Sequence, residues 1–152
     1  MYKFNAYFGI EDNPGTDLPY LKVNKSHYWD GDSNSKRYNT LVNIETYKEF
    51  NTSDSEHLIE YNPGYVYALN IDYNKEQTPK KGAGIFLHCF TRNKYTLGCV
   101  AIHKYDLYYI YKEVNKDCYI IINTKENMTQ YYSASKFIYL GLLMFVCLFL
   151  CL

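Results

Sequence analysis

The chain has 152 residues, balanced charges and a pI near 6.9. This length allows one domain with a substantial hydrophobic core and is short for two domains of average size. Because the charges balance and no block of Lys and Arg occurs, the sequence argues against a nucleic-acid-binding protein. Tyrosine contributes 19 residues, and its ring with a polar tip suits a core edge or a polar groove.

The N-terminal half is predicted to contain mostly loops. Residues 1–15 lack a charged segment followed by an apolar one, so no signal peptide is visible. Residues 10–64 are rich in Asn, Asp, Ser, Gly and Pro, which predicts long loops with short extended pieces around Leu21–Val23 and Leu41–Ile44.

The pattern changes at Tyr65, where apolar and aromatic residues alternate with a period of two as far as Tyr73. This alternation predicts a strand with one well-buried face. Continuous apolar runs at 85–90, 99–102 and 118–123 predict three further strands. Between the last two runs, an apolar stripe with helical spacing predicts an amphipathic helix: Leu107, Ile110, Tyr111 and Val114. We therefore expect a mixed, mainly β fold with one or two helices over residues 1–124.

The end of the chain differs in composition, because residues 137–152 are apolar and no charge follows Lys136. We expect a linker at 125–136 and a hydrophobic C-terminal helix at 137–152. Such a helix would be about 24 Å long, shorter than the ~30 Å hydrocarbon core of a bilayer. Two interpretations stay open, a membrane tail anchor with membrane association and a non-native extension.

The cysteines show neither disulfide nor metal spacing. The five are Cys89, Cys99, Cys118, Cys147 and Cys151, and no Cys-x-x-Cys pair occurs among them. We expect neither a disulfide framework nor a metal or other cofactor, and the odd count leaves at least one free thiol.

A histidine and a cysteine stand at the ends of two neighbouring apolar runs, at His88 and Cys99. Their separation is too long for one helix face and suits two adjacent strands joined by a loop. A histidine can take the proton of a thiol, and the resulting ion pair lowers the thiol pKa. A fall from near 8.5 to ~6 would raise the thiolate fraction at pH 7 roughly 30-fold.

The residues before Cys99 fit such a site. Gly98 allows close backbone approach, and consecutive N–H groups there could face a developing oxyanion. Thr96 could orient the loop or donate its hydroxyl. The alternative is structural, with Cys99 as a small buried hydrophobe and His88 as a satisfied strand-end residue.

Several blocks together resemble the YkuD-like L,D-transpeptidase catalytic domain. The stretch 82–88 is similar to that family's Gly-Ser-Ala-Ile-Phe-Leu-His, and 96–101 to its Thr-x-Gly-Cys-Val-Ala. Its Glu-His-Leu block matches at 56–58, and its Tyr-Asn at 73–74. A further block, Trp-x-x-Asp-x-x-Ser-x-x-Tyr-Asn, matches Trp29, Asp32, Ser35, Tyr38 and Asn39.

The resemblance implies a β-sandwich enzyme that acts on peptidoglycan stem peptides, at the cell envelope or outside the cell. Cys99 would attack a carbonyl between an L- and a D-centre and form a thioester, with His88 as general base. The N–H groups of Gly98 and Cys99 would bind the oxyanion. An amine or water would then accept the acyl group. The blocks also give candidate substrate-binding residues: Thr96, Trp29, Tyr38, Asn39 and His57.

Some positions depart from the family. Leu97 and Ala101 replace a histidine and an arginine of its better-known branch, and Ala83 replaces a serine. Members also have more N-terminal sequence, so we expect an N-terminally truncated domain. An inactive remnant that binds the cell wall or a protein is therefore the alternative function.

Overall fold

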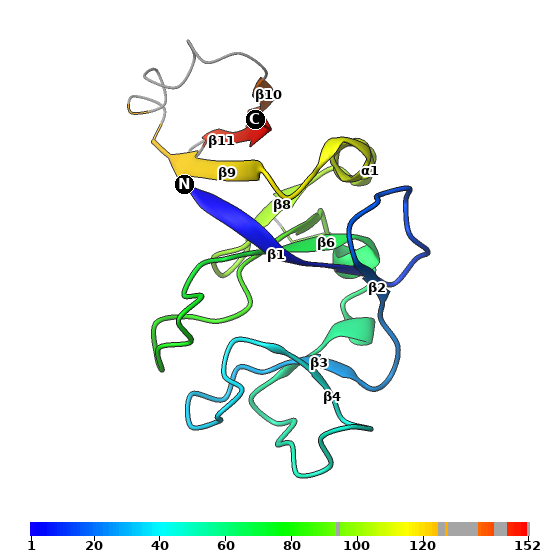
Figure 1. The fold of residues 1–152 in the computed structure, drawn as a ribbon, viewed down its shortest axis with the longest axis vertical. Helices are drawn as coiled ribbons and strands as arrows, with labels where there is room; N and C mark the ends of the chain where they lie inside the picture. The colour runs from blue at the N-terminus through cyan, green and yellow to red at the C-terminus, as the bar shows by residue number, and fades with distance from the viewer. Residues whose placement is uncertain (94, 125–126, 128–136, 142–145, 152) are drawn as a thin grey trace.

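The computed structural model describes residues 1–93, 95–124, 127, 137–141 and 146–151. A mixed sheet contains most of the strands, in the order β10-β11-β9-β1-β6-β7-β8, with β2 beside β1 (Figure 1). Their bounds are β1 Tyr2–Gly9, β2 Tyr20–Lys22, β6 Ala68–Ile71, β7 Phe86–Cys89, β8 Val100–Ile102, β9 Cys118–Asn123, β10 Phe137–Gly141 and β11 Val146–Cys151. In this sheet the β1–β2 and β7–β8 pairs are parallel, and the pairs of β1 with β6 and β9 and of β6 with β7 are antiparallel. The expected mixed, mainly β class is confirmed.

Strand β1 lies at the centre of the sheet, although the sequence patterns predicted no strand there. One of its edges pairs with β6. The other pairs with β9 near Tyr2 and with β2 near Phe8. Side chains of β1 pack into both hydrophobic clusters. Phe4 and Tyr7 belong to the first cluster, and Phe8 belongs to the second.

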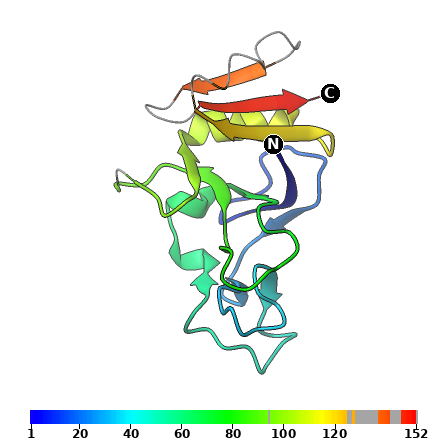
Figure 2. The same ribbon diagram turned by 90° about the vertical axis from the view of Figure 1, so that its left-hand side faces the viewer.

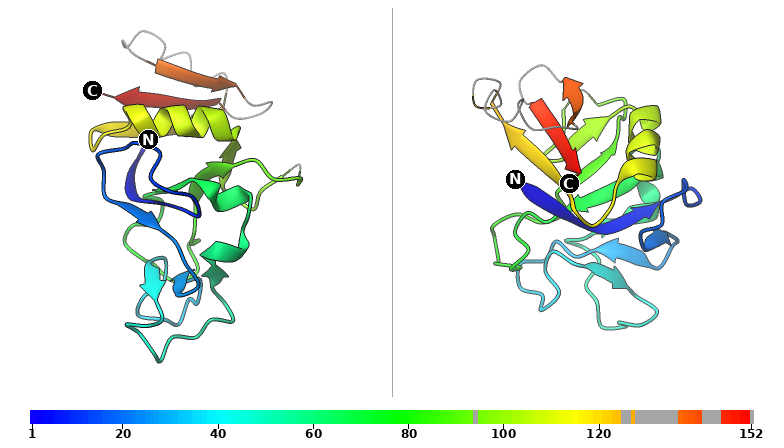
Figure 3. Two further views of the ribbon diagram at one scale, coloured as in Figure 1. Left: turned by 90° about the vertical axis from the view of Figure 1, so that its right-hand side faces the viewer. Right: turned by 45° about the horizontal axis from the view of Figure 1, so that its top comes forward.

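One helix, α1 (Lys104–Glu113), packs on the first of these clusters (Figure 3). Leu107, Ile110 and Tyr111 are buried, so the predicted amphipathic helix is confirmed. The Tyr111 hydroxyl donates hydrogen bonds to the carbonyls of Phe8 and Ala68. These bonds tie the helix to β1 and β6.

A small second sheet lies at the end of the molecule opposite β10 and β11 (Figure 1). Its order is β4-β3-β5, with β3 at His27–Trp29, β4 at Leu41–Asn43 and β5 at Glu56–His57. Two short 3-10 helices, η1 (Leu58–Glu60) and η2 (Gly64–Val66), lead from β5 back to the large sheet (Figure 2). Trp29 joins the second cluster, where it packs at 5.0 Å from the Phe86 ring.

The strand expected from Tyr65 to Tyr73 is shorter than the alternation predicted. Only Ala68–Ile71 forms a strand, β6, and all four of its residues are buried. Residues 64–66 form η2 instead. The prediction of one buried face was wrong because a cluster covers each face of β6: Ala68 belongs to the second cluster, and Leu69 and Ile71 belong to the first.

The predicted C-terminal helix is also not found. Residues 137–141 and 146–151 form β10 and β11, and β11 pairs antiparallel with β9 along its whole length. A run in which every residue is apolar has no period, so the pattern cannot distinguish a helix from a buried strand. Within the described part of the chain, no helix is long and apolar enough to cross a bilayer. The linker expected at 125–136 falls outside the described residues, apart from residue 127.

Candidate functional site

The β7–β8 pair brings His88 and Cys99 to one face of the sheet. The two strands are parallel, and His88 pairs with Ala101. Cys99 directly precedes β8 and packs against the second cluster, and the His88 ring contacts Tyr65, a member of that cluster, so both side chains lie on the same side of the sheet. The expected arrangement of two adjacent strands is therefore present.

The Cys99 thiol lies against the backbone at the start of β7. Its Sγ donates to the Gly84 carbonyl at 3.2 Å and accepts from the Phe86 N–H at 3.3 Å. The thiol is thus protonated and makes no described hydrogen bond to His88.

His88 is held in the tautomer that a general base requires. Its Nδ1 lies 2.8 Å from the Cys89 carbonyl. A carbonyl only accepts, so Nδ1 carries the proton and Nε2 carries the free lone pair. Within the described residues Nε2 has no hydrogen-bond partner. Burial lowers the pKa of His88, against a smaller opposing effect of the bond to Cys89, so the ring is neutral at pH 7.

The electrostatics of Cys99 differ from the sequence-based expectation. Burial raises the pKa of the Cys99 thiol to about 11, the Phe86 N–H lowers it, and the negative charge of Glu56 raises it. The expected resting ion pair, with its lowered thiol pKa, is therefore wrong. The site holds a neutral thiol and a neutral imidazole, so the proton must leave the sulfur in step with its attack.

This electrostatic state predicts slow alkylation of Cys99 at neutral pH. In a Cys89→Ser variant, which removes the second of the two free cysteines among the side chains that the structure describes, the rate of iodoacetamide labelling of Cys99 should rise with pH toward a midpoint near 11. The raised pKa keeps the thiolate fraction below that of an ordinary cysteine at every pH under this midpoint. Labelling followed by mass spectrometry measures the profile, and a midpoint at or below the usual ~8.5 would contradict it.

Gly98 and Thr96 shape the approach to Cys99. Gly98 has φ +129°, a conformation that L side chains rarely adopt, and a Cβ there would lie 3.1 Å from Ile85 Cδ1. The Thr96 hydroxyl donates to the Cys99 carbonyl at 2.6 Å. Thr96 therefore holds the loop in place, one of the two roles expected for it. The part of Gly98 in an oxyanion hole stays a prediction.

Trp29, Tyr38 and Asn39 are 3%, 5% and 8% exposed, and Trp29 and Asn39 lie against Gly84. Asn39 Oδ1 accepts from Trp29 Nε1 and from the Gly84 N–H, both at 3.0 Å. Asn39 Nδ2 donates to the carbonyls of Tyr73 and Asn74, each at 3.1 Å. Their contacts make Trp29 and Asn39 supports of the loop that receives the thiol, and direct contact of the three residues with substrate stays a prediction.

Replacing Asn39 with alanine should therefore destabilise the fold by about 2–4 kcal/mol. The change removes four hydrogen bonds at a buried position. It also places alanine at φ +58°, where asparagine is tolerated better. Urea unfolding measures the loss, with the exposed Asn34→Ala as matched control, expected within about 0.5 kcal/mol of the unaltered chain. Equal midpoints for the two variants would contradict the supporting role.

His57 belongs to a different environment. Its Nδ1 lies 2.8 Å from Glu60 Oε1, its Nε2 lies 2.9 Å from the Lys25 carbonyl, and its ring stacks on Tyr28 at 4.3 Å. Both nitrogens are used in contacts around β3 and η1. No described contact brings His57 to Cys99, and its substrate-binding role stays a prediction.

Two residues beside Cys99 were not among the predicted site residues, Glu56 and Tyr65. The Tyr65 hydroxyl donates to Glu56 Oε2 at 2.6 Å, and the Tyr65 ring meets the His88 ring edge-on at 5.5 Å. Burial raises the pKa of Glu56, and the bond from Tyr65 lowers it by less. The family-like block at 56–58 contained Glu56, whereas no sequence signal pointed to Tyr65, whose position depends on η2.

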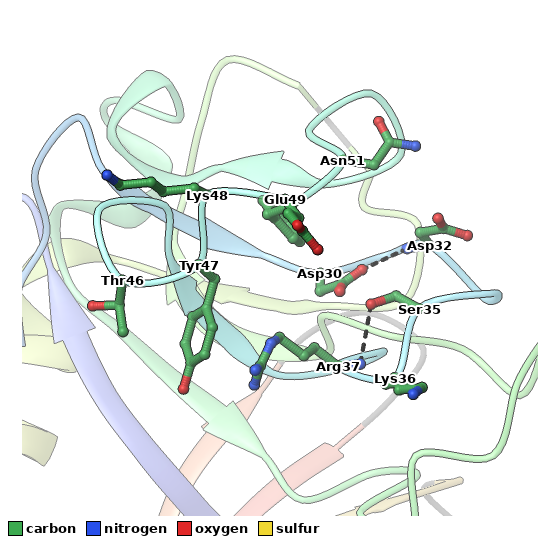
Figure 4. Close-up of a pocket in the computed structure, with 11 residues that line it drawn as sticks. Asp30, Asp32, Ser35, Lys36, Arg37, Thr46, Tyr47, Lys48, Glu49 and Asn51 are labelled. Carbon is green, nitrogen blue, oxygen red and sulfur yellow. Dashed lines mark hydrogen bonds between the residues drawn. The ribbon is translucent and has the colours of Figure 1, made fainter.

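Two surface pockets are formed elsewhere. One, of about 530 Å³, lies between the loops around Arg37 and Tyr47, whose guanidinium and ring are 3.4 Å apart (Figure 4). The other, of about 470 Å³, lies beside Glu11 and Tyr108. Neither is lined by His88 or Cys99, so we take the candidate site from side-chain chemistry rather than from cavity size. Within the described residues, no group of three or more His, Cys, Asp or Glu side chains could hold a metal ion.

Comparisons of the chain with protein-family models, curated proteins and solved structures found no match. A function for this chain must therefore be argued from its own residues.

Proposed function

We propose that the chain is a cysteine acyltransferase of the L,D-transpeptidase type, with a YkuD-like β-sandwich domain. The observation that carries the proposal is the parallel register of β7 and β8, which puts Cys99 and His88 on one face. The fixed tautomer of His88 supports it, because the free Nε2 is the atom that a base needs. The ordered sequence blocks supply the substrate class, peptidoglycan stem peptides. A substrate of this class places the protein at the cell envelope or outside the cell.

In the first step the thiol proton passes from Cys99 Sγ to His88 Nε2 as the sulfur attacks. The sulfur attacks the carbonyl between the L- and D-centres, and the N–H groups of Gly98 and Cys99 bind the oxyanion. Collapse of the tetrahedral intermediate breaks the C–N bond, and His88 returns the proton to the departing amino group of the D-residue. A thioester on Cys99 remains. An amine or water then takes the acyl group and regenerates the thiol.

The direct test is release of the D-residue. The full chain is incubated with a synthetic tetrapeptide stem, and the free D-amino acid is quantified by chiral chromatography. Release that scales with protein concentration and requires Cys99 is the expected result. A folded sample that releases no D-residue, with or without an added amine, would refute the proposed activity.

The second candidate is a non-catalytic module that binds the cell wall or a protein. Two observations favour it, the raised pKa of the Cys99 thiol and the Leu97 side chain, 97% exposed beside the site. A module of this kind would retain stem peptide on a pull-down without releasing the D-residue, so the same incubation separates the two functions.

A further inference from the structure

The pocket between the loops around Arg37 and Tyr47 carries charges that the protein does not pair (Figure 4). Its volume of about 530 Å³ lies in the usual range for small-molecule sites. Charged side chains of both signs line it: Asp30, Asp32, Lys36, Arg37, Lys48 and Glu49. None of them takes part in an ion pair that the structure describes. A ligand in this pocket would therefore meet unpaired cations and unpaired carboxylates together.

Asp30 supplies a buried carboxylate oxygen that lacks a hydrogen-bond donor. The residue directly follows β3, is 0% exposed and is held at its backbone, where its N–H donates to the Thr40 carbonyl at 2.9 Å. In its side chain, Oδ1 accepts from the Asp32 N–H at 2.9 Å, whereas Oδ2 has no partner among the described residues. A buried acceptor without a donor is rare and unfavourable. A donor on a ligand in the adjoining pocket would satisfy it.

Arg37 supplies the opposite charge in a fixed orientation. Its guanidinium carbon lies 3.4 Å from the centroid of the Tyr47 ring. This stacking uses one face of the planar group and leaves the N–H donors at its edge available. No described hydrogen bond or ion pair uses these donors. A guanidinium held in this way is suited to bind a carboxylate through two parallel hydrogen bonds.

The rim of the pocket allows a ligand to enter. Lys36, Lys48 and Glu49 are exposed, so their long side chains can turn aside toward solvent. The Tyr47 ring is 38% exposed, and Phe50 is half-buried. These two aromatic residues give the pocket an apolar part beside its charges. A ligand that fits has two opposite charges and a small apolar group.

We propose that this pocket binds the zwitterion of a free amino acid, with the carboxylate on Arg37 and the ammonium group on Asp30 Oδ2. A simple anion would leave Asp30 without a donor, and a simple cation would leave Arg37 without an acceptor. The inference goes beyond the proposed function and does not depend on it, because neither His88 nor Cys99 lines the pocket.

Binding is measured with three probes of the same shape. L-Phenylalanine has both charged groups, phenethylamine lacks the carboxylate, and 3-phenylpropionate lacks the ammonium group. Each is titrated into the full chain, and the backbone amides of residues 30–37 and 46–51 are followed by NMR. We expect phenylalanine to bind at least about tenfold more tightly than either of the other two. Equal or tighter binding of one singly charged probe, or no shift of these amides at millimolar phenylalanine, would overturn the inference.

Two variants test the two ends of the ligand separately. Arg37→Gln should abolish the preference for phenylalanine over phenethylamine, and the exposed Arg92→Gln is the matched control that should keep it. Asp30→Asn retains an oxygen for the Asp32 N–H and should abolish the preference over 3-phenylpropionate. A preference that survives in either folded variant would overturn the role of that residue. If Asp30→Asn does not fold, the comparison of the two arginine variants still decides whether the pocket binds the carboxylate.

Discussion

Replacing Cys99 with serine is expected to abolish the thioester and to lower D-residue release by about 10⁴-fold or more. Serine has nearly the shape of cysteine, and its hydroxyl can still donate to the Gly84 carbonyl and accept from the Phe86 N–H. The fold should therefore persist. The hydroxyl is a far weaker acid than the thiol, so a single neutral imidazole does not activate it comparably. Initial rates of D-residue release provide the measurement.

The matched control is Cys89→Ser. Cys89 is the next residue after His88, but its side chain points to the opposite face and packs in the cluster beneath α1. Because the Cys89 thiol cannot reach a substrate on the Cys99 face, its replacement should leave turnover within about twofold, with a modest loss of stability. Equal losses of activity in the two variants would show that the effect comes from folding rather than from the nucleophile.

Replacing His88 with glutamine should lower turnover by about 10²–10⁴-fold, the range for loss of a general base. Glutamine can still donate to the Cys89 carbonyl, but it offers no group that takes a proton near neutral pH. The bound stem peptide should be retained, so kcat is expected to fall more than KM rises. A variant with unchanged kcat would exclude His88 as the base.

The pH profile of the unaltered chain tests the same role. Burial lowers the pKa of His88 below the ordinary value of 6.5. The active neutral form therefore persists to lower pH than for an exposed histidine, and activity should be lost only below pH 6.5. An acidic limb with its midpoint above 6.5 would contradict a buried, neutral base.

Local patterns predicted the elements whose signal lies within one segment. The helical stripe from Leu107 to Tyr111 gave α1, and the apolar runs at 85–90 and 118–123 gave β7 and β9. Strand β1 was missed because its role depends on distant partners, β6, β9 and β2. The helix predicted for the C-terminal segment was wrong because a wholly apolar run shows neither helical nor strand periodicity. Pairing with β9 makes residues 146–151 a strand.

The sequence indicated which two residues form the candidate site, but it did not indicate the pKa of the thiol or all of the neighbouring side chains. The spacing of His88 and Cys99 correctly indicated two adjacent strands. The thiol pKa was predicted in the wrong direction, because burial and the charge of Glu56 depend on tertiary packing. The supporting role of Asn39, which accepts a hydrogen bond from the Gly84 N–H, could not be read from the sequence, because it depends on how the loops fold. Glu56 and Tyr65 come together through β5 and η2, which no sequence spacing revealed.

The most direct measurement is the location of the acyl group after incubation with a tetrapeptide stem. The chain is quenched in acid and digested, and its peptides are mapped by mass spectrometry. We expect the mass of the stem tripeptide acyl group on the peptide that contains Cys99, with the peptide that contains Cys89 unmodified. An acyl group on Cys89, or none on Cys99 in a sample that has released the D-residue, would show that Cys99 is not the nucleophile.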